Sequence, residues 1–285
     1  MKNSSPSSPS DQLPVTRELK LAYALSLVVA LLMAVASAAG LLHTSGIYPT
    51  QELRKTFVSN DVVNLFIGLP ILLGSMWLAQ RNKLIGLLFW PGALFYALYN
   101  YIVYVLGMPL TLASLVYLAL VMLSAYTLLS LVASIDGPAV QQRLAGAVPE
   151  RFAGGVLTGL GALFFLRAIG VLVSALINQT LLARTQVALH IADLIITPAW
   201  VMGGIWLWRH RALGYVTGAG LLFSASMLFI GLLVFFVLQP FLTATPFPLA
   251  DFVVIFVMGL VCFVPFALFV RGAVSKEKQI RKGRQ

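Results

Sequence analysis

The chain has 285 residues, of which 60% are hydrophobic and only 10% are charged, and its formal net charge is +10. Soluble domains carry charge on about a quarter of their residues, so this composition excludes a water-soluble domain. The positive balance alone would suit nucleic acid, but the placement of the basic residues indicates a membrane surface and no nucleic acid.

Eight apolar runs follow a leader that is rich in Ser and Pro. Each run is close to the roughly 20 residues that a helix needs to cross the hydrocarbon core of a bilayer. A backbone inside lipid must satisfy its own hydrogen bonds, so each run predicts a helix. The runs are residues 21–42, 62–80, 84–106, 110–134, 156–177, 187–208, 212–238 and 252–270. We therefore predict an all-α polytopic integral membrane protein with eight transmembrane helices.

A shift of 128 positions superimposes the second and third runs on the sixth and seventh. The matched residues include a proline and two glycines, in the pairs Pro70/Pro198, Gly86/Gly214 and Gly92/Gly220. A unit with an even number of spans keeps its orientation when it is duplicated, so the two copies would be parallel. We expect five parts: a disordered cytoplasmic tail (1–20), a four-helix repeat (21–134), a cytoplasmic linker (135–155), a second four-helix repeat (156–270) and a basic cytoplasmic tail (271–285).

The basic residues set the expected orientation. Of the 19 Lys and Arg residues, 15 fall on the two tails and on alternate loops, while the opposite face holds Arg54, Lys55 and Arg184. Because cytoplasmic loops of membrane proteins are enriched in Lys and Arg, we predict that both termini are cytoplasmic.

Residues 60–107 read NDVVNLFIGLPILLGSMWLAQRNKLIGLLFWPGALFYALYNYIVYVLG. This stretch resembles a group of uncharacterised multispanning membrane proteins of bacteria and archaea. The resemblance implies a prokaryotic cell membrane, and it brings no known activity, cofactor or site residue.

Two matched prolines, Pro70 and Pro198, lie near the middle of their runs. A proline ring removes one helical hydrogen bond and frees the carbonyl one turn earlier, here at Phe66 and Leu194. Both helices are predicted to kink there. Interrupted spans at matching positions of two repeats are typical of a transporter's central site, although proline is also common in membrane helices generally.

Arg167 is the one basic residue deep in a predicted span, and Asp193 lies within the next one. Charges inside membrane helices pair with one another, so we predict an Arg167–Asp193 ion pair that acts as a gate, a proton relay or an anion site, or that joins two helices structurally. His190 and Thr197 share a helical face with Asp193, which would let the carboxylate orient the imidazole.

Polar residues also mark the outer half of the first repeat. The candidates for a substrate or proton-relay site there are Asp61, Asn64, Tyr96, Tyr99 and Asn100. An asparagine inside lipid needs a partner, so we expect Asn100 to bond across helices to Asn64 or to a tyrosine hydroxyl.

Tyr101 and Tyr104 follow on the same run. Tyrosine is enriched at the membrane interface, where its hydroxyl reaches water, so both are predicted to belong to the interfacial aromatic belt.

Metal and cofactor sites are not expected. The chain has three histidines: His43 would approach His190, and His210 lies on the cytoplasmic side. With one cysteine and no metal-binding motif, this set is too small for a metal or haem site.

Three functions remain open. The first is a transporter-like protein with an outward-facing polar cavity, since duplication and paired prolines are typical of carriers. The second is a membrane-embedded enzyme or binder that acts on a lipid, isoprenoid or quinone, and the third is a non-catalytic assembly component. The expected partners are the lipid bilayer and a small-molecule or lipid ligand.

Overall fold

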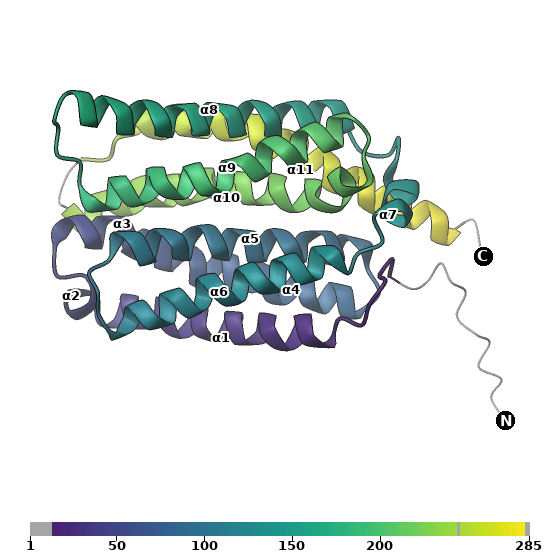
Figure 1. The fold of residues 1–285 in the computed structure, drawn as a ribbon, viewed down its shortest axis with the longest axis horizontal. Coiled ribbons are helices and arrows are strands. Elements are labelled where there is room, and N and C mark those ends of the chain that lie inside the picture. Colours follow the sequence, from purple (N-terminus) through teal and green to yellow (C-terminus); the bar gives the residue numbers. More distant parts are fainter. Residues whose placement is uncertain (1–12, 244–245, 283–285) are drawn as a thin grey trace.

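The structure, a computed structural model, describes residues 13–243 and 246–282. Within these ranges eight helical spans are long and apolar enough to cross a membrane. This confirms the prediction of an all-α, multi-pass integral membrane protein. The spans run side by side along the long axis of the molecule, and the described part of the chain begins and ends at the same end of the bundle (Figure 1).

The spans follow one another through short connections. In chain order they are α1 (Lys20–Leu42), a helix formed by α3 (Gln51–Val63), the π-helical η1 (Asn64–Gly68) and α4 (Leu69–Gln80), then α5 (Leu84–Gly107), α6 (Leu112–Ala133), α8 (Glu150–Ile177), α9 (Arg184–Trp208), α10 (Ala212–Thr243) and α11 (Leu249–Lys282). Two short helices, α2 (Thr44–Ile47) and α7 (Gly137–Leu144), lie in connections.

The second span begins eleven residues earlier than predicted, at Gln51 instead of residue 62. Its first turns are polar, so hydropathy does not detect them, but they contain no helix breaker. The helix starts where Thr50 caps it, with the Thr50 hydroxyl accepting from the Leu53 N–H at 3.3 Å. Asp61 therefore lies ten residues, or about 15 Å, inside the helix and not at its boundary.

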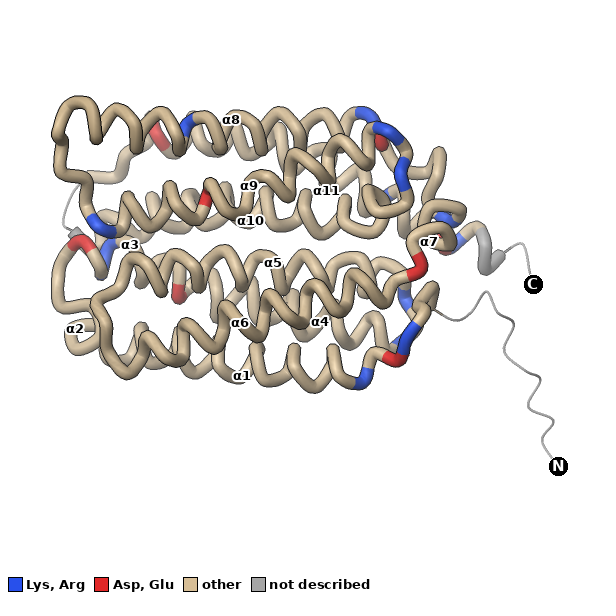
Figure 2. The backbone as a smooth tube through the Cα atoms, in the orientation of Figure 1, with Lys and Arg blue, Asp and Glu red and all other residues tan. Residues whose placement is uncertain are grey.

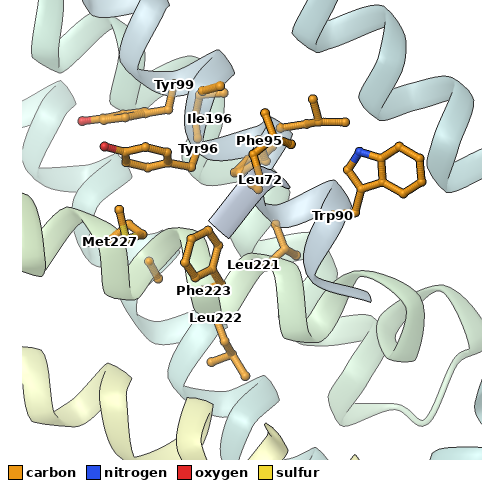
Figure 3. Close-up of a cluster of buried hydrophobic side chains, with 14 of the residues drawn as sticks. Leu72, Trp90, Phe95, Tyr96, Tyr99, Ile196, Leu221, Leu222, Phe223 and Met227 are labelled. Atoms are coloured by element: carbon orange, nitrogen blue, oxygen red, sulfur yellow. The ribbon is translucent and has the colours of Figure 1, made fainter. Parts of the chain in front are cut away.

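Helix α5 lies in the middle of the bundle and packs against α4, α6, α9 and α10. Its residues are consequently buried on every side, and Trp90, Phe95 and Tyr96 contribute to a cluster with residues of α10 such as Leu222 and Phe223 (Figure 3). This central position explains why α5 carries the most aromatic and polar side chains of the core.

Helices α5 and α10 approach one another closely at Gly92 and Gly220. A Cβ atom added to Gly92 would lie 2.6 Å from the Gly220 carbonyl oxygen, and one added to Gly220 would lie 2.9 Å from the Gly92 Cα. Small residues allow membrane helices to pack backbone against backbone. These two glycines therefore set the distance between the two central helices.

Most Lys and Arg residues gather at the end of the bundle that carries α7 and both termini (Figure 2). At this end residues 13–16 run along the connection after α6: the Thr16 N–H donates to the Ser134 carbonyl, and the Asp136 N–H donates to the Pro14 carbonyl, both at 2.8 Å. Residues 1–12 of the predicted disordered tail lie outside the described residues. Its remaining part, by contrast, packs on the predicted linker.

The predicted linker and basic tail both contain helix. Residues 135–155 include α7 and the first turns of α8, and α11 continues through the predicted tail as far as Lys282. As at Gln51, the helix extends beyond the apolar run.

Candidate functional site

Asp61 lies at the centre of a buried polar cluster and is 1% exposed. The Tyr48 hydroxyl donates to Asp61 Oδ2 at 2.6 Å, and the Tyr104 hydroxyl donates to Oδ1 at 2.8 Å. Within the described ranges no Lys, Arg or His nitrogen lies within 4.0 Å of this carboxylate. The acid is thus held by neutral donors alone.

Helix α1 covers the carboxylate from the other side. Its Gly40 has no side chain, and a Cβ there would lie 2.6 Å from Tyr48 Oη and 2.9 Å from Asp61 Cγ. Ser37, one turn earlier on the same face, has its Oγ beside Asp61 but makes no hydrogen bond with any described residue. Glycine at position 40 therefore makes the room in which Asp61 packs.

Aromatic rings enclose the cluster. The Tyr104 ring lies 4.4 Å from Phe57 and 5.0 Å from Tyr117, measured between ring centroids, and Tyr101 lies 6.1 Å from Tyr117. The prediction that Tyr101 and Tyr104 belong to the interfacial belt is wrong, because they are 0% and 1% exposed. A belt residue must face lipid, and α5 has no lipid-facing side at this height.

Tyr48 lies in the connection between α2 and α3, outside the spans. Burial and the neighbouring Asp61 raise the pKa of the Tyr48 hydroxyl above its usual value, so it remains protonated and a donor. The sequence analysis missed this residue. No spacing pattern relates a tyrosine in a loop to an acid in the following helix, so the sequence carries no signal for the contact.

Asn64 begins the π-helical segment η1, which ends two residues before Pro70. Its Oδ1 accepts a hydrogen bond of 2.8 Å from Tyr96, while its Nδ2 is buried without a partner among the described residues. The predicted disturbance at Pro70 thus takes the form of a π-helical turn, a feature common at functional sites. Pro198, in contrast, lies inside α9, which is α-helical throughout.

Asn100 does not bond across helices as predicted. Its Nδ2 donates to the Tyr96 carbonyl of its own helix at 3.1 Å. The carbonyl one turn earlier is always within reach of a helical side chain, so a distant partner is not needed.

A second cluster links α5 to α9. The Tyr99 hydroxyl donates to Asp193 Oδ1 at 3.0 Å, and both residues are buried. Figure 3 shows Tyr99 beside Tyr96, with both hydroxyls on the same side. Here the sequence analysis named the right residues but the wrong pair, because it matched Asp193 with a charged partner.

The predicted Arg167–Asp193 ion pair is not formed. Arg167 is exposed on α8, and no nitrogen of its side chain lies within 4.0 Å of the Asp193 carboxylate. Its charge still interacts with Asp193, His190 and Tyr99 at longer range. Arg167 is exposed and out of contact distance, and Tyr99 of the central helix takes the place next to Asp193.

The histidines are dispersed. His190 is buried and its Nδ1 has no partner in the described part of the chain, so Asp193 does not orient it as predicted. Thr197, on the same face, donates to the Asp193 backbone carbonyl at 2.7 Å. His43 is exposed after α1, and His210 lies 3.1 Å from the Tyr215 hydroxyl at the opposite end. Among the residues that the structure describes, no three His, Cys, Asp or Glu side chains group as metal ligands do.

Two contacts join α9 to other spans at the end that carries α2. Glu52 of α3 accepts from the Thr185 hydroxyl at 2.5 Å and from the Thr185 N–H at 3.4 Å. Arg184 Nε donates to the Leu106 carbonyl of α5 at 3.0 Å. The carboxylate of Glu52 thus lies at the N-terminus of α9, where the helix dipole favours a negative charge. The sequence analysis did not single out this contact.

Comparison of the chain with protein-family models, with curated proteins and with solved structures finds no match. The resemblance of residues 60–107 to multispanning prokaryotic proteins stays a prediction.

Proposed function

We propose that this chain is a membrane carrier for a small molecule, held here in a closed conformation, and that Asp61 is the group whose charge is coupled to its opening. One observation carries the proposal. Asp61 is buried at membrane depth and contacts two neutral hydroxyls but no basic residue of the described ranges.

A purely structural explanation of Asp61 is weaker. Removing a carboxylate from water costs several kcal/mol even after the protein relaxes, and hydrogen bonds from two hydroxyls offset only part of that cost. A neutral polar residue would join α3 to α5 without this desolvation cost. Ionisable residues inside membrane bundles therefore mark ion and substrate paths by default.

The proposed architecture is two parallel four-helix repeats related by an axis along the membrane normal. The contact of Gly92 with Gly220 supports it, because these residues are equivalent under the shift of 128 positions and residues on a twofold axis meet their own equivalents. Helix α5 packs on α9 while α10 packs on α3, as exchange of equivalent helices requires.

In this scheme the contacts between the two repeats keep the carrier closed toward the outside. Glu52 with Thr185, and Leu106 with Arg184, join the repeats at their outer ends. Tyr99 with Asp193 joins them about 14 Å along α9 from Arg184. A carrier that opens outward would break the first two contacts and expose the third.

The distribution of charge supports an orientation with both termini in the cytoplasm, and the resemblance of residues 60–107 supports a prokaryotic cell. The end of the bundle with the termini holds most Lys and Arg residues (Figure 2), and such residues are retained on the cytoplasmic side. Glu52 and Thr185 then face the outside.

The test uses the fact that Cys262 is the chain's one cysteine and is buried in α11. In a Cys262→Ala background, Ser37→Cys places a thiol beside Asp61. A maleimide that does not cross membranes is added to intact cells, and labelling is followed over time. We expect slow labelling whose rate changes in Asp61→Asn, because a carrier exposes its centre from time to time.

The native protein, labelled in parallel at Cys262, is the control for a permanently buried thiol. If Ser37→Cys stays as unreactive as Cys262 from both faces of the membrane, in cells and in inverted vesicles, the chain does not open and the carrier function is wrong.

A further inference from the structure

We infer that the Asp61 cluster is a binding site for one sodium ion, formed by oxygen atoms of α1, α3, α5 and the connection before α3. The inference depends on the proposed function for its biological use, as the coupling ion of the carrier. The binding itself has an independent test.

Unpartnered oxygens surround an acid here. Each Asp61 oxygen accepts one tyrosine hydrogen bond, from Tyr48 or Tyr104, and so keeps a free lone pair. Ser37 Oγ lies next to both the Asp61 carboxylate and Tyr101 Oη, and neither Ser37 nor Tyr101 makes a hydrogen bond of regular geometry with a described residue. Buried polar atoms are nearly always partnered in folded proteins, by protein, water or an ion.

The chemistry of these atoms selects the ligand. Every one is oxygen, and hard cations prefer oxygen while zinc and copper prefer nitrogen and sulfur. The cluster holds a single carboxylate, whereas calcium sites use several and magnesium keeps most of its water. One negative charge in a dry site is balanced by one positive charge, which indicates a monovalent ion.

The fold also brings these oxygens together. Gly40 lets the carboxylate lie directly against α1, next to Ser37 on the same face. The neighbouring aromatic rings of Phe57 and Tyr117 exclude water from this side. An ion held here would join α1 to α3 and α5, and its loss would loosen those contacts.

The experiment measures the melting temperature of the purified full-length protein in detergent. Sodium chloride is compared with potassium chloride and choline chloride at equal ionic strength. A ligand that binds only the folded state raises the melting temperature as its concentration increases. We expect a saturable rise with sodium that potassium and choline do not produce.

Variants locate the effect. Removing one of few oxygen ligands weakens ion binding on the order of tenfold, so Ser37→Ala and Tyr101→Phe should shift the sodium midpoint upward by that factor. Asp61→Asn should abolish the response. Ser124→Ala is the matched control, since Ser124 Oγ on α6 is equally buried and unpartnered within the described ranges but lies outside the cluster.

Binding of radioactive sodium to monodisperse protein is the second measurement. If Asp61→Asn does not fold, Ser37→Ala and Tyr101→Phe decide the question. The inference is wrong if sodium and choline give the same melting temperature for the native chain, or if Ser37→Ala and Tyr101→Phe both bind sodium as the native chain does.

The two proposals fail differently. Sodium binding by a protein whose Ser37→Cys thiol is never labelled would leave the ion site intact and overturn the carrier. Labelling that depends on Asp61, without any sodium response, would leave the carrier intact and overturn the sodium site.

Discussion

Gly92 of α5 and Gly220 of α10 lie backbone against backbone at the centre of the bundle, and neither helix has room for a methyl group there. A Cβ on Gly92 would approach the Gly220 carbonyl to 2.6 Å, so the helices must separate or shift to admit it. The distance between the central helices depends on this pair.

Gly92→Ala and Gly220→Ala are therefore expected to destabilise the protein by about 1 to 3 kcal/mol, the usual cost of overpacking a tight core. Thermal unfolding in detergent measures the effect. Gly74→Ala in α4 is the control, because a Cβ at Gly74 meets no atom within 4 Å. Equal melting temperatures for all three variants would contradict the tight contact.

Gly40→Ala tests the packing of Asp61 on α1. The added methyl would lie 2.9 Å from Asp61 Cγ and 2.6 Å from Tyr48 Oη, so it displaces the carboxylate or breaks its bond to Tyr48. We expect a lower melting temperature and loss of the response to sodium.

Gly46→Ala is the control for that change, since Gly46 lies in the following short helix with open space around it. A Gly40→Ala protein that retains both native stability and the sodium response would mean that the carboxylate is not seated against Gly40.

The contact between Glu52 and Thr185 is expected to keep the outer end closed. Thr185→Val removes the hydroxyl that donates to Glu52 while preserving the shape of the side chain. In the Ser37→Cys background, labelling from outside should become faster, by about 10- to 150-fold at most, because the loss of one hydrogen bond to a charged group is worth about 1.5 to 3 kcal/mol at most.

Thr56→Val on α3 is the comparison for this prediction, as a threonine at the same end that is not part of the contact. Labelling rates that are the same for the Thr185→Val and Thr56→Val proteins would show that the Glu52 contact does not restrain opening.

Tyr99→Phe removes the sole side-chain donor to Asp193 that is found within the described residues. An unsatisfied buried carboxylate oxygen costs about 1 to 3 kcal/mol, so stability should decrease by that amount. Tyr126→Phe on α6, where the ring is 57% exposed, should have no effect. Thermal unfolding of both proteins measures the difference, and a Tyr99→Phe protein as stable as the control would rule out the bond.

The sequence could identify single residues of the candidate site, but it could not identify contacts between residues far apart in the chain. Asp61, Asn64, Tyr96, Tyr99 and Asp193 could be named because polar residues stand out within apolar runs. Their partners could not be named. Tyr104 lies 43 positions after Asp61, and Asp193 lies 94 positions after Tyr99, so only the packing of separate helices brings them together.

The errors have a common physical cause. The Arg167–Asp193 pair followed from matching opposite charges at similar depth, and the aromatic belt followed from the position of Tyr101 and Tyr104 near one end of a run. Both arguments need to know which helices face lipid. A run's hydropathy does not contain that information, whereas the bundle buries α5 and leaves Arg167 exposed.

The sequence by itself determined that this protein has eight helices long and apolar enough to cross a membrane, because a backbone in hydrocarbon must satisfy its own hydrogen bonds and runs of about 20 apolar residues are too long for barrel strands. The tertiary structure decided which buried polar groups meet. Tyr48, Tyr104 and Asp61 come from a loop and two helices, and their contact exists only where α1 leaves room at Gly40.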